Sequence, residues 1–266
     1  MNGGQAEVDL AANHLIALLE RHMPGFIESL TLIGSAADGD FRPGKSDLDF
    51  VAVLARPISE AVVEGLVVVH RLYGSDLTLS TLDGIWVTAA ELAAGPDATP
   101  EGPSTRDGQF LERAAGNRNP VTWLALRDAS LTILGTLDRT AIRHDPSRLR
   151  SWTRENVESY WAPWLAQSRE FLSGSGIATL RASAVMWGVL GISRLHYTLA
   201  TGRIASKSEA GEHALAVFEP RWHPIIEEAL RIRRGGSGRR YRSPFARRRG
   251  ALDFVETAIE AIRRNY

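Results

Sequence analysis

The sequence predicts an α/β domain followed by an all-helical domain. Up to about residue 145, apolar runs of strand length alternate with longer segments of helical length, as in a sheet covered by helices. From Leu149 onward, apolar residues recur at helical spacing. We therefore expect domains at residues 1–145 and 146–266. A chain of 266 residues with 44% hydrophobic content can supply a core for each.

The first half contains one predicted helix, two strands, a second helix and a third strand. Residues 6–25 carry apolar side chains at helical spacing and end at a Pro-Gly pair, which predicts a helix. Residues 29–35 and 47–54 predict two strands joined by a polar turn. Residues 58–74 are as apolar as a buried strand, but their length favours a helix. Residues 82–88 predict the third strand.

A loop separates these elements from the rest of the chain. Residues 93–108 hold three Pro and three Gly, which predicts a long surface loop of the kind that often acts as a lid. Residues 119–130 then predict a helix, and residues 131–135 predict the last strand. The second half predicts helices at residues 148–172, 177–202, 206–218, 219–235 and 251–265.

Composition excludes several kinds of site. The chain has no cysteine, which rules out disulfides, thiolate nucleophiles and thiolate metal ligands, and its seven histidines show no zinc-binding spacing. No apolar run reaches the ~18 residues of a membrane-spanning helix. The N-terminus lacks the basic-then-apolar order of a secretory signal. We therefore expect a cytoplasmic protein with no membrane partner.

Positive charge is concentrated in one segment, although the formal net charge is zero. Nine arginines lie between Arg231 and Arg249, interleaved with Gly, Ser and Pro as in a flexible loop. The segment could be a solvated loop between helices, contact a triphosphate or bind nucleic acid. Nucleic acid is the weakest of these, since no aromatic stacking platform accompanies the arginines.

The segment LIGSAADGDFRPGKSDLDFVAVL at residues 32–54 carries the chemistry. Side chains alternate along a strand, so Asp47 and Asp49 point to one face and the apolar residues after them serve the core. Two such carboxylates suit Mg²⁺, which shares its site with substrate phosphates. Gly34 allows close backbone approach, and Ser35 with the following N–H groups can face an anion. The segment therefore predicts a metal-nucleotide site; the alternative is an acidic turn at a solvated strand end.

These residues resemble the GS-x-DxD signature of the nucleotidyltransferase superfamily, which includes DNA polymerase β. In the second half, residues 193–215 (SRLHYTLATGRIASKSEAGEHAL) and 220–230 (PRWHPIIEEAL) resemble the aminoglycoside 3″/9 adenylyltransferases, which modify streptomycin and spectinomycin. That resemblance implies an N-terminal nucleotidyltransferase domain with a mixed sheet and a C-terminal helical bundle, with ATP and drug bound in the cleft between them.

The resemblance also implies the roles of individual residues. It places Ser35 and Ser46 against the triphosphate of ATP, beside Gly34, and makes Asp47 and Asp49 ligands of two Mg²⁺ ions.

Two basic residues are implied to reach the phosphates from the helical domain. Arg194 projects from a helix that otherwise shows apolar residues, and Lys207 stands at the start of the next helix. Both can therefore flank one cleft, although a basic residue at either position could equally be a solvated helix end or a surface ion pair.

Members of this family carry a Glu in the strand after DxD that acts as a general base on the attacking hydroxyl. Alignment of residues 82–92 with that strand puts Asp83 at the position, as base and third metal ligand. Aspartate is shorter than glutamate by one methylene, and reach matters on the scale of an ångström. Asp76 is the competing candidate, and the absence of any protein base is the third possibility.

The acceptor site departs from the family. Ala184 and Val185 stand where acidic residues that hold a cationic antibiotic are expected. Trp187 could offer a stacking face or belong to the core. Glu155 and Glu158 could face the cleft or simply solvate a surface.

Taken together, the resemblance implies Mg²⁺-dependent transfer of AMP from ATP to a hydroxyl of a small hydroxylated amine, most simply an aminoglycoside, which is an antibiotic-resistance activity. The alternatives are a nucleotide-binding homologue without turnover and a nucleotidyltransferase acting on RNA or protein. A monomer is the favoured state.

Overall fold

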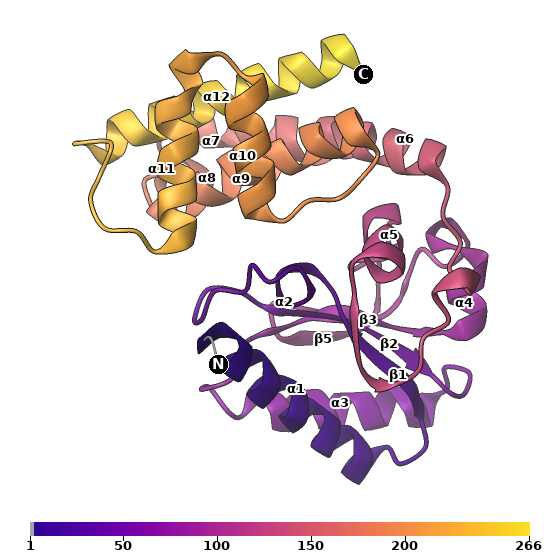
Figure 1. The fold of residues 1–266 in the computed structure, drawn as a ribbon. Helices are drawn as coiled ribbons and strands as arrows, with labels where there is room; N and C mark the ends of the chain where they lie inside the picture. The colour runs from indigo at the N-terminus through magenta and orange to yellow at the C-terminus, as the bar shows by residue number, and fades with distance from the viewer. Residues whose placement is uncertain (1–2) are drawn as a thin grey trace. The chain divides into compact units, whose positions relative to one another are not determined.

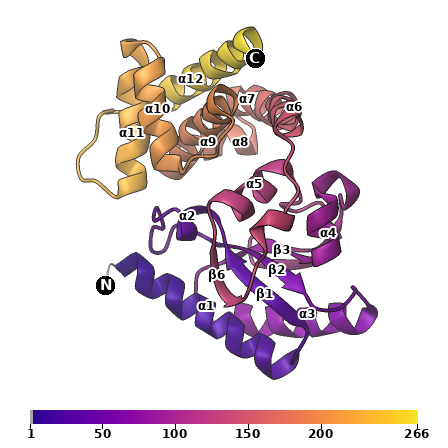
Figure 2. The same cartoon turned by 45° about the vertical axis from the view of Figure 1, so that its right-hand side comes forward.

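The computed structural model describes residues 3–266. The chain divides into two compact units, the first ending at Asp145 and the second spanning Pro146–Tyr266. The first combines a mixed sheet with helices and the second is helical, as Figures 1 and 2 show, so the predicted fold class is confirmed.

A six-stranded sheet in the order β5-β4-β3-β2-β1-β6 forms the first unit. The central pair β2 and β3 is parallel, and the other neighbours are antiparallel. The strands are β1 Ile27–Leu32, β2 Leu48–Leu54, β3 Leu82–Thr88, β4 Gly102–Arg106, β5 Gln109–Ala114 and β6 Leu131–Gly135. The helices are α1 Gly3–His22, α2 Gly34–Ala37, α3 Glu60–Gly74, α4 Ala89–Ala94 and α5 Pro120–Asp128, with short 3₁₀ turns η1 Pro96–Ala98 and η2 Arg139–Ala141.

Helices α1 and α3 lie side by side on one face of this sheet (Figure 2). Leu15 of α1 and Leu66 of α3 are fully buried against Leu30, Phe50 and the sheet around them. Segment 58–74 is thus a helix, as its length favoured. The Ser59 side chain caps the start of α3 by accepting a hydrogen bond from the Val62 N–H at 3.4 Å.

The predicted loop at residues 93–108 is wrong, because most of the segment is ordered into elements. It holds the end of α4, the η1 turn and strand β4. Strand β4 pairs with β3 at Gly84↔Thr105 and Ile85↔Ser104, and both β4 side chains are fully buried. Its Gly, Pro and hydroxyl residues gave no strand signal, since the strand is stabilised by pairing with distant residues.

The second unit is built around α9, which packs against α10, α11 and α12. Its elements are α6 Pro146–Asn156, η3 Val157–Trp161, α7 Ala162–Arg169, α8 Gly174–Ala178, α9 Ala182–Thr201, α10 Lys207–Val217, η4 Pro220–Trp222, α11 His223–Arg234 and α12 Pro244–Asn265. Buried Val189, Ile192, Ile226 and Phe254 belong to its core.

Two predicted helices differ from their expected form. The helix predicted over residues 148–172 contains a π-helical turn at Val157–Trp161 and ends at Arg169. Pro163 follows that turn. Proline lacks a backbone N–H, and its ring clashes with the preceding turn of a regular α-helix. The wider π-helical turn relieves this clash. The helix predicted over 177–202 is broken between α8 and α9.

The arginine-rich segment is not one flexible loop. Helix α11 ends at Arg234 and α12 begins at Pro244, so arginines 247–249 belong to a helix. Within the described residues, no helix has the length and apolar character needed to cross a membrane.

Candidate functional site

The parallel pair β2 and β3 brings the predicted acidic residues together. Asp49 and Asp83 are direct register partners, next to the pair Leu48↔Leu82. Asp47 comes one residue before β2 begins. Leu48 and Phe50 are fully buried and Asp49 is half-buried, whereas residues 51–54 are all buried, so β2 exposes a polar side chain only at its start. The starts of two neighbouring strands therefore carry the three carboxylates.

The glycine turn lies directly against one of these carboxylates. Gly34 has φ +59°, and a Cβ at this position would stand 2.5 Å from Asp49 Oδ2. The Ile33 N–H donates to the Asp49 carbonyl oxygen at 3.0 Å, which fixes the turn to β2. Only glycine fits both the left-handed backbone and the close approach. The predicted association of this turn with the acidic strand is thus present in the fold.

Ser35 and Ser46 flank this turn. Ser35 is the second residue of α2, and its carbonyl oxygen accepts a hydrogen bond from the Asp40 N–H at 3.0 Å. The Ser46 Oγ accepts from the Arg42 N–H at 3.0 Å. Arg42 also donates to Asp40 at 2.8 Å, and Asp40 is almost fully buried. The loop between α2 and β2 is therefore held by its own polar contacts.

The surroundings of Asp83 make its carboxylate unusually basic. Burial, followed by the negative charges of Asp47 and Asp107, raises the pKa of Asp83 to about 6, against the opposing effects of Arg106 and a hydrogen bond from Asn117. A carboxylate of this kind is ionised near neutral pH and can still accept a proton. The shift also shows that Asp47 and Asp83 are close enough to interact electrostatically.

Asp76, the competing candidate, is engaged elsewhere. Its Oδ1 accepts hydrogen bonds from the Thr78 N–H at 3.0 Å and the Thr78 hydroxyl at 2.6 Å in the exposed turn after α3. These bonds lower the pKa of Asp76 below its ordinary value. A carboxylate held this way is a poor proton acceptor, so the local geometry favours Asp83.

Asn117 is a residue that sequence reasoning missed. Its side-chain N–H donates to Asp83 Oδ1 at 2.8 Å from the turn between β5 and α5. No sequence motif marks this asparagine. The nearest signal was the Gly-Asn-Arg-Asn-Pro run before α5, which indicates a turn and a helix cap but not the partner of either asparagine.

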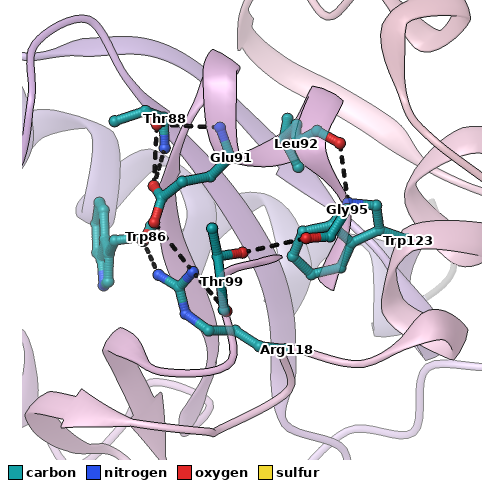
Figure 3. A network of polar contacts seen from close by, with 8 residues as sticks. All are labelled: Trp86, Thr88, Glu91, Leu92, Gly95, Thr99, Arg118 and Trp123. Carbon is teal, nitrogen blue, oxygen red and sulfur yellow. Dashed lines mark hydrogen bonds and ion pairs between the residues drawn. The ribbon is translucent and has the colours of Figure 1, made fainter. Parts of the chain in front are cut away.

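The next residue anchors that turn (Figure 3). The Arg118 side chain is fully buried and donates to the Trp86 carbonyl oxygen at 2.6 Å and to Glu91 at 3.4 Å. A Cβ at Gly102 would stand 2.3 Å from the Arg118 guanidinium, so that glycine makes room for it. Trp86 and Asp83 belong to the same strand, and the turn is therefore tied to β3 at two points.

The donor set of the three carboxylates fits magnesium by its chemistry. All the candidate ligands are oxygens, and Mg²⁺ characteristically uses one or two carboxylates and takes its remaining ligands from water and substrate phosphates. Across residues 3–266, no group of three or more His, Asp or Glu residues is placed so that it could hold a metal ion. A metal ion at these carboxylates would need further ligands from water or from a nucleotide.

In the second unit, Arg194 and Lys207 belong to adjoining elements. The Arg194 Nε donates to the Ala205 carbonyl oxygen at 2.9 Å, two residues before Lys207 opens α10. Ser206 and Glu209 form a capping box that fixes the start of that helix. The two basic residues are thus held on one local framework.

The other acceptor-site candidates have structural partners. Glu158 pairs with Arg263 at 2.6 Å and Glu155 with Arg148 at 3.2 Å, both as exposed ion pairs. Trp187 stacks on Trp161, with ring centroids 4.7 Å apart, and packs against the core of the helical unit.

Several arginines of the arginine-rich segment serve the fold. Glu228 is fully buried and binds Arg231 at 2.8 Å, with Arg247 at 3.8 Å. Arg240 pairs with Glu227 at 2.9 Å. A partly open hollow of about 470 Å³ borders these groups. Part of the segment's positive charge is therefore neutralised within the helical unit.

Comparison with known proteins supports the resemblance. Residues 176–248 match the family model described as the aminoglycoside adenylyltransferase C-terminal domain. The chain is 24% identical over 232 residues to aminoglycoside (3″)(9) adenylyltransferases of Shigella flexneri and Escherichia coli, which covers 84% of this chain and 84% of each relative.

A solved structure shares the fold. The spectinomycin adenyltransferase AAD(9) from Enterococcus faecialis, determined with ATP and spectinomycin, matches with a TM-score of 0.68 and 15% identity, over 95% of this chain and 99% of that one. The chain is therefore similar to the aminoglycoside (3″)(9) adenylyltransferases over most of its length, and residues 176–248 match the model of that family's C-terminal domain.

Proposed function

We propose that this protein transfers AMP from ATP to a hydroxyl of a small molecule, with an aminoglycoside such as streptomycin or spectinomycin as the acceptor. The observation that carries the proposal is the meeting of the Gly34 turn with Asp49, whose register partner is Asp83. The relatives are aminoglycoside adenylyltransferases by name, and the structural neighbour was determined with ATP and spectinomycin, which supports both the reaction and the acceptor class.

Asp47 and Asp49 would hold two Mg²⁺ ions together with the triphosphate. Bound magnesium supplies charge neutralisation at the α-phosphate and polarises its oxygens. The contribution of the chain is to fix the two carboxylates: Asp49 by its place in β2 and by contact with the Gly34 turn, Asp47 by the buried strand that follows it. Ser35 and Ser46 would face the phosphates from either side of that turn.

Asp83 would take the proton of the attacking hydroxyl. The acceptor oxygen forms a bond to the α-phosphorus, the bond from that phosphorus to the bridging oxygen breaks, and pyrophosphate leaves with its electron pair. The hydroxyl proton passes to the Asp83 carboxylate, whose raised pKa of about 6 makes it a competent acceptor near neutral pH.

Arg194 and Lys207 would neutralise charge on the triphosphate and on the departing pyrophosphate. Arginine and lysine are suited to this role, because charge-assisted hydrogen bonds to phosphate are among the stronger polar contacts. Their common framework at the start of α10 would keep both cations near one phosphate chain.

Acceptor binding would rely less on fixed negative charge than in the relatives. Ala184 and Val185 offer no carboxylate, and Glu155 and Glu158 already have arginine partners. An acceptor with fewer ammonium groups, or one held through an apolar ring face, fits this composition better than a polycation. Spectinomycin and streptomycin are therefore to be tested beside neutral hydroxylated compounds.

The direct test is incubation with Mg²⁺, ATP and a panel of acceptors, followed by mass spectrometry for an added AMP. Wild type should adenylylate one acceptor, and Asp49→Asn should abolish transfer without unfolding the protein. Asp76→Asn, which removes an exposed carboxylate from the same unit, is the matched control and should keep activity. Equal turnover by Asp49→Asn would refute the assignment.

A second candidate function is nucleotide binding without turnover. The shorter reach of Asp83 compared with the family's glutamate favours it. ATP binding without pyrophosphate release, across the whole acceptor panel, would support this reading over transfer.

A further inference from the structure

We propose that Asn117 is a positioning residue for Asp83, holding its carboxylate in the orientation that proton transfer needs. The inference rests on the proposed function, which makes Asp83 the proton acceptor. Neither the family resemblance nor the sequence pattern singles out this asparagine.

The contact is short and specific. The Asn117 Nδ2 donates to Asp83 Oδ1 at 2.8 Å, across 34 positions of sequence. Pairing in the sheet fixes the Asp83 backbone opposite Asp49 but leaves rotation of the carboxylate free. A hydrogen bond to one oxygen fixes that rotation and directs the other oxygen away from Asn117.

The carboxylate needs such a restraint. Asp47 and Asp107 lie close enough for their negative charges to act on Asp83. Like charges repel and Arg106 attracts, so in the metal-free protein the Asp83 carboxylate is subject to opposing electrostatic forces. Asn117 carries no net charge, so its hydrogen bond can hold the Asp83 carboxylate without adding a further attractive or repulsive charge.

The turn that carries Asn117 is packed closely against the sheet. Gly116 has φ +51°, and a Cβ there would stand 2.7 Å from the Ser104 Cβ, so the backbone lies close against β4. The buried Arg118 side chain then binds the Trp86 carbonyl oxygen (Figure 3). Trp86 lies three residues after Asp83 on β3. The same strand therefore positions both the Asn117 amide and the Asp83 carboxylate.

A purely structural role is the competing explanation, in which Asn117 only stabilises its turn. Asn119 provides a matched control, since it lies in the same turn and its Oδ1 caps α5 by accepting from the Val121 and Thr122 N–H groups. It makes no side-chain contact with Asp83 among the hydrogen bonds of the described residues.

The experiment compares Asn117→Ala, Asn119→Ala, Asp83→Ala and the Asn117→Ala/Asp83→Ala double variant. Three quantities are measured: kcat for AMP transfer, the affinity for Mn²⁺ in the presence of ATP by electron paramagnetic resonance, and the urea midpoint of unfolding. Loss of an outer partner of a metal-site carboxylate typically costs about 10–100-fold in activity or metal affinity.

Asn117→Ala should lower kcat or Mn²⁺ affinity at least tenfold while KM for ATP and the urea midpoint change little. Asn119→Ala should lower the midpoint and keep kcat within about twofold. In the Asp83→Ala background, Asn117→Ala should cause no further loss of Mn²⁺ affinity, since its action passes through Asp83. The kcat comparison is confined to variants that keep Asp83.

Parallel losses of stability and activity in Asn117→Ala and Asn119→Ala would overturn the inference, as would an undiminished effect of Asn117→Ala when Asp83 is absent. If wild type transfers AMP to no acceptor, the proposed function fails on that result. The Mn²⁺ cycle then decides on Asn117 alone: coupling to Asp83 supports its positioning role, and additivity rejects it.

Discussion

Asp83→Asn should stabilise the metal-free protein at neutral pH while removing its activity. Folding raises the pKa of this carboxyl from 3.8 to about 6, mainly through burial and the charge of Asp47. A shift of about two units corresponds to about 3 kcal/mol against the folded state once the group is ionised. Because Asp83 is partly exposed, we expect roughly half of that, about 1–2 kcal/mol, as the gain from the neutral amide.

The sign of the effect gives it a pH signature. Below pH 3.8, the Asp83 carboxyl is protonated in the folded and unfolded chains alike, so the variant and wild type should differ least there. As pH rises towards 6, the unfolded chain releases this proton while the folded chain retains it, and wild type loses stability relative to the variant. Above that pH the difference should be constant.

Urea denaturation with a metal chelator, at pH 4.5 and pH 7.5, measures this difference directly. The free energy of unfolding should be higher for Asp83→Asn at pH 7.5, and the gap should shrink at pH 4.5. Contributions from histidines cancel, since both proteins carry the same ones. An equal or lower stability of the variant at pH 7.5 would refute the claim that Asp83 is held at an energetic cost.

Three further predictions concern other parts of the molecule. Gly34→Ala should lower stability by about 1–2 kcal/mol in urea unfolding and also lower kcat, because its φ is +59° and its Cβ would meet Asp49; unchanged kcat would argue against the close approach. Lys207→Ala should raise KM for ATP about tenfold, equivalent to about 1.5 kcal/mol, with a smaller change in kcat. Steady-state kinetics with ATP as the varied substrate measures this, and an unchanged KM would argue against a contact between Lys207 and the triphosphate. Burial lowers the pKa of His70 to about 4. As the pH falls from 6.5 towards 4, the unfolded chain therefore binds a proton at this histidine before the folded chain does, and the free energy of unfolding should fall by up to about 3 kcal/mol. In urea unfolding, His70→Gln should flatten this part of the pH profile, and an unaltered profile would contradict the assignment of the slope to His70.

The features predictable from sequence are those set by neighbouring residues. The strands around Asp49 and Asp83 follow from short apolar runs, and the Gly34 turn follows from a glycine between a strand and a polar loop. Each signal lies within about ten residues, which is the range over which side-chain periodicity and turn chemistry act. The sequence also predicted close backbone approach at Gly34, although not that the group lying against it is the Asp49 side chain.

The features missed are those created by pairing between distant segments. Strand β4 is buried against β3 although its Ser104 and Thr105 are polar, and its sequence alone indicates a loop. Asn117 meets Asp83 only because the β4–β5 hairpin returns the chain to β3. Arg118 was equally hidden, since a buried arginine is recognised only by the carbonyl and carboxylate that surround it.

The central claim is that Asp47, Asp49 and Asp83 support nucleotidyl transfer to a small hydroxylated acceptor. Its most direct test is mass spectrometry of an acceptor panel after incubation with Mg²⁺ and ATP, comparing wild type with Asp49→Asn. The account predicts a product heavier by one AMP with wild type and none with the variant. An acceptor modified equally by both proteins, or ATP bound with no product from any acceptor, would contradict it.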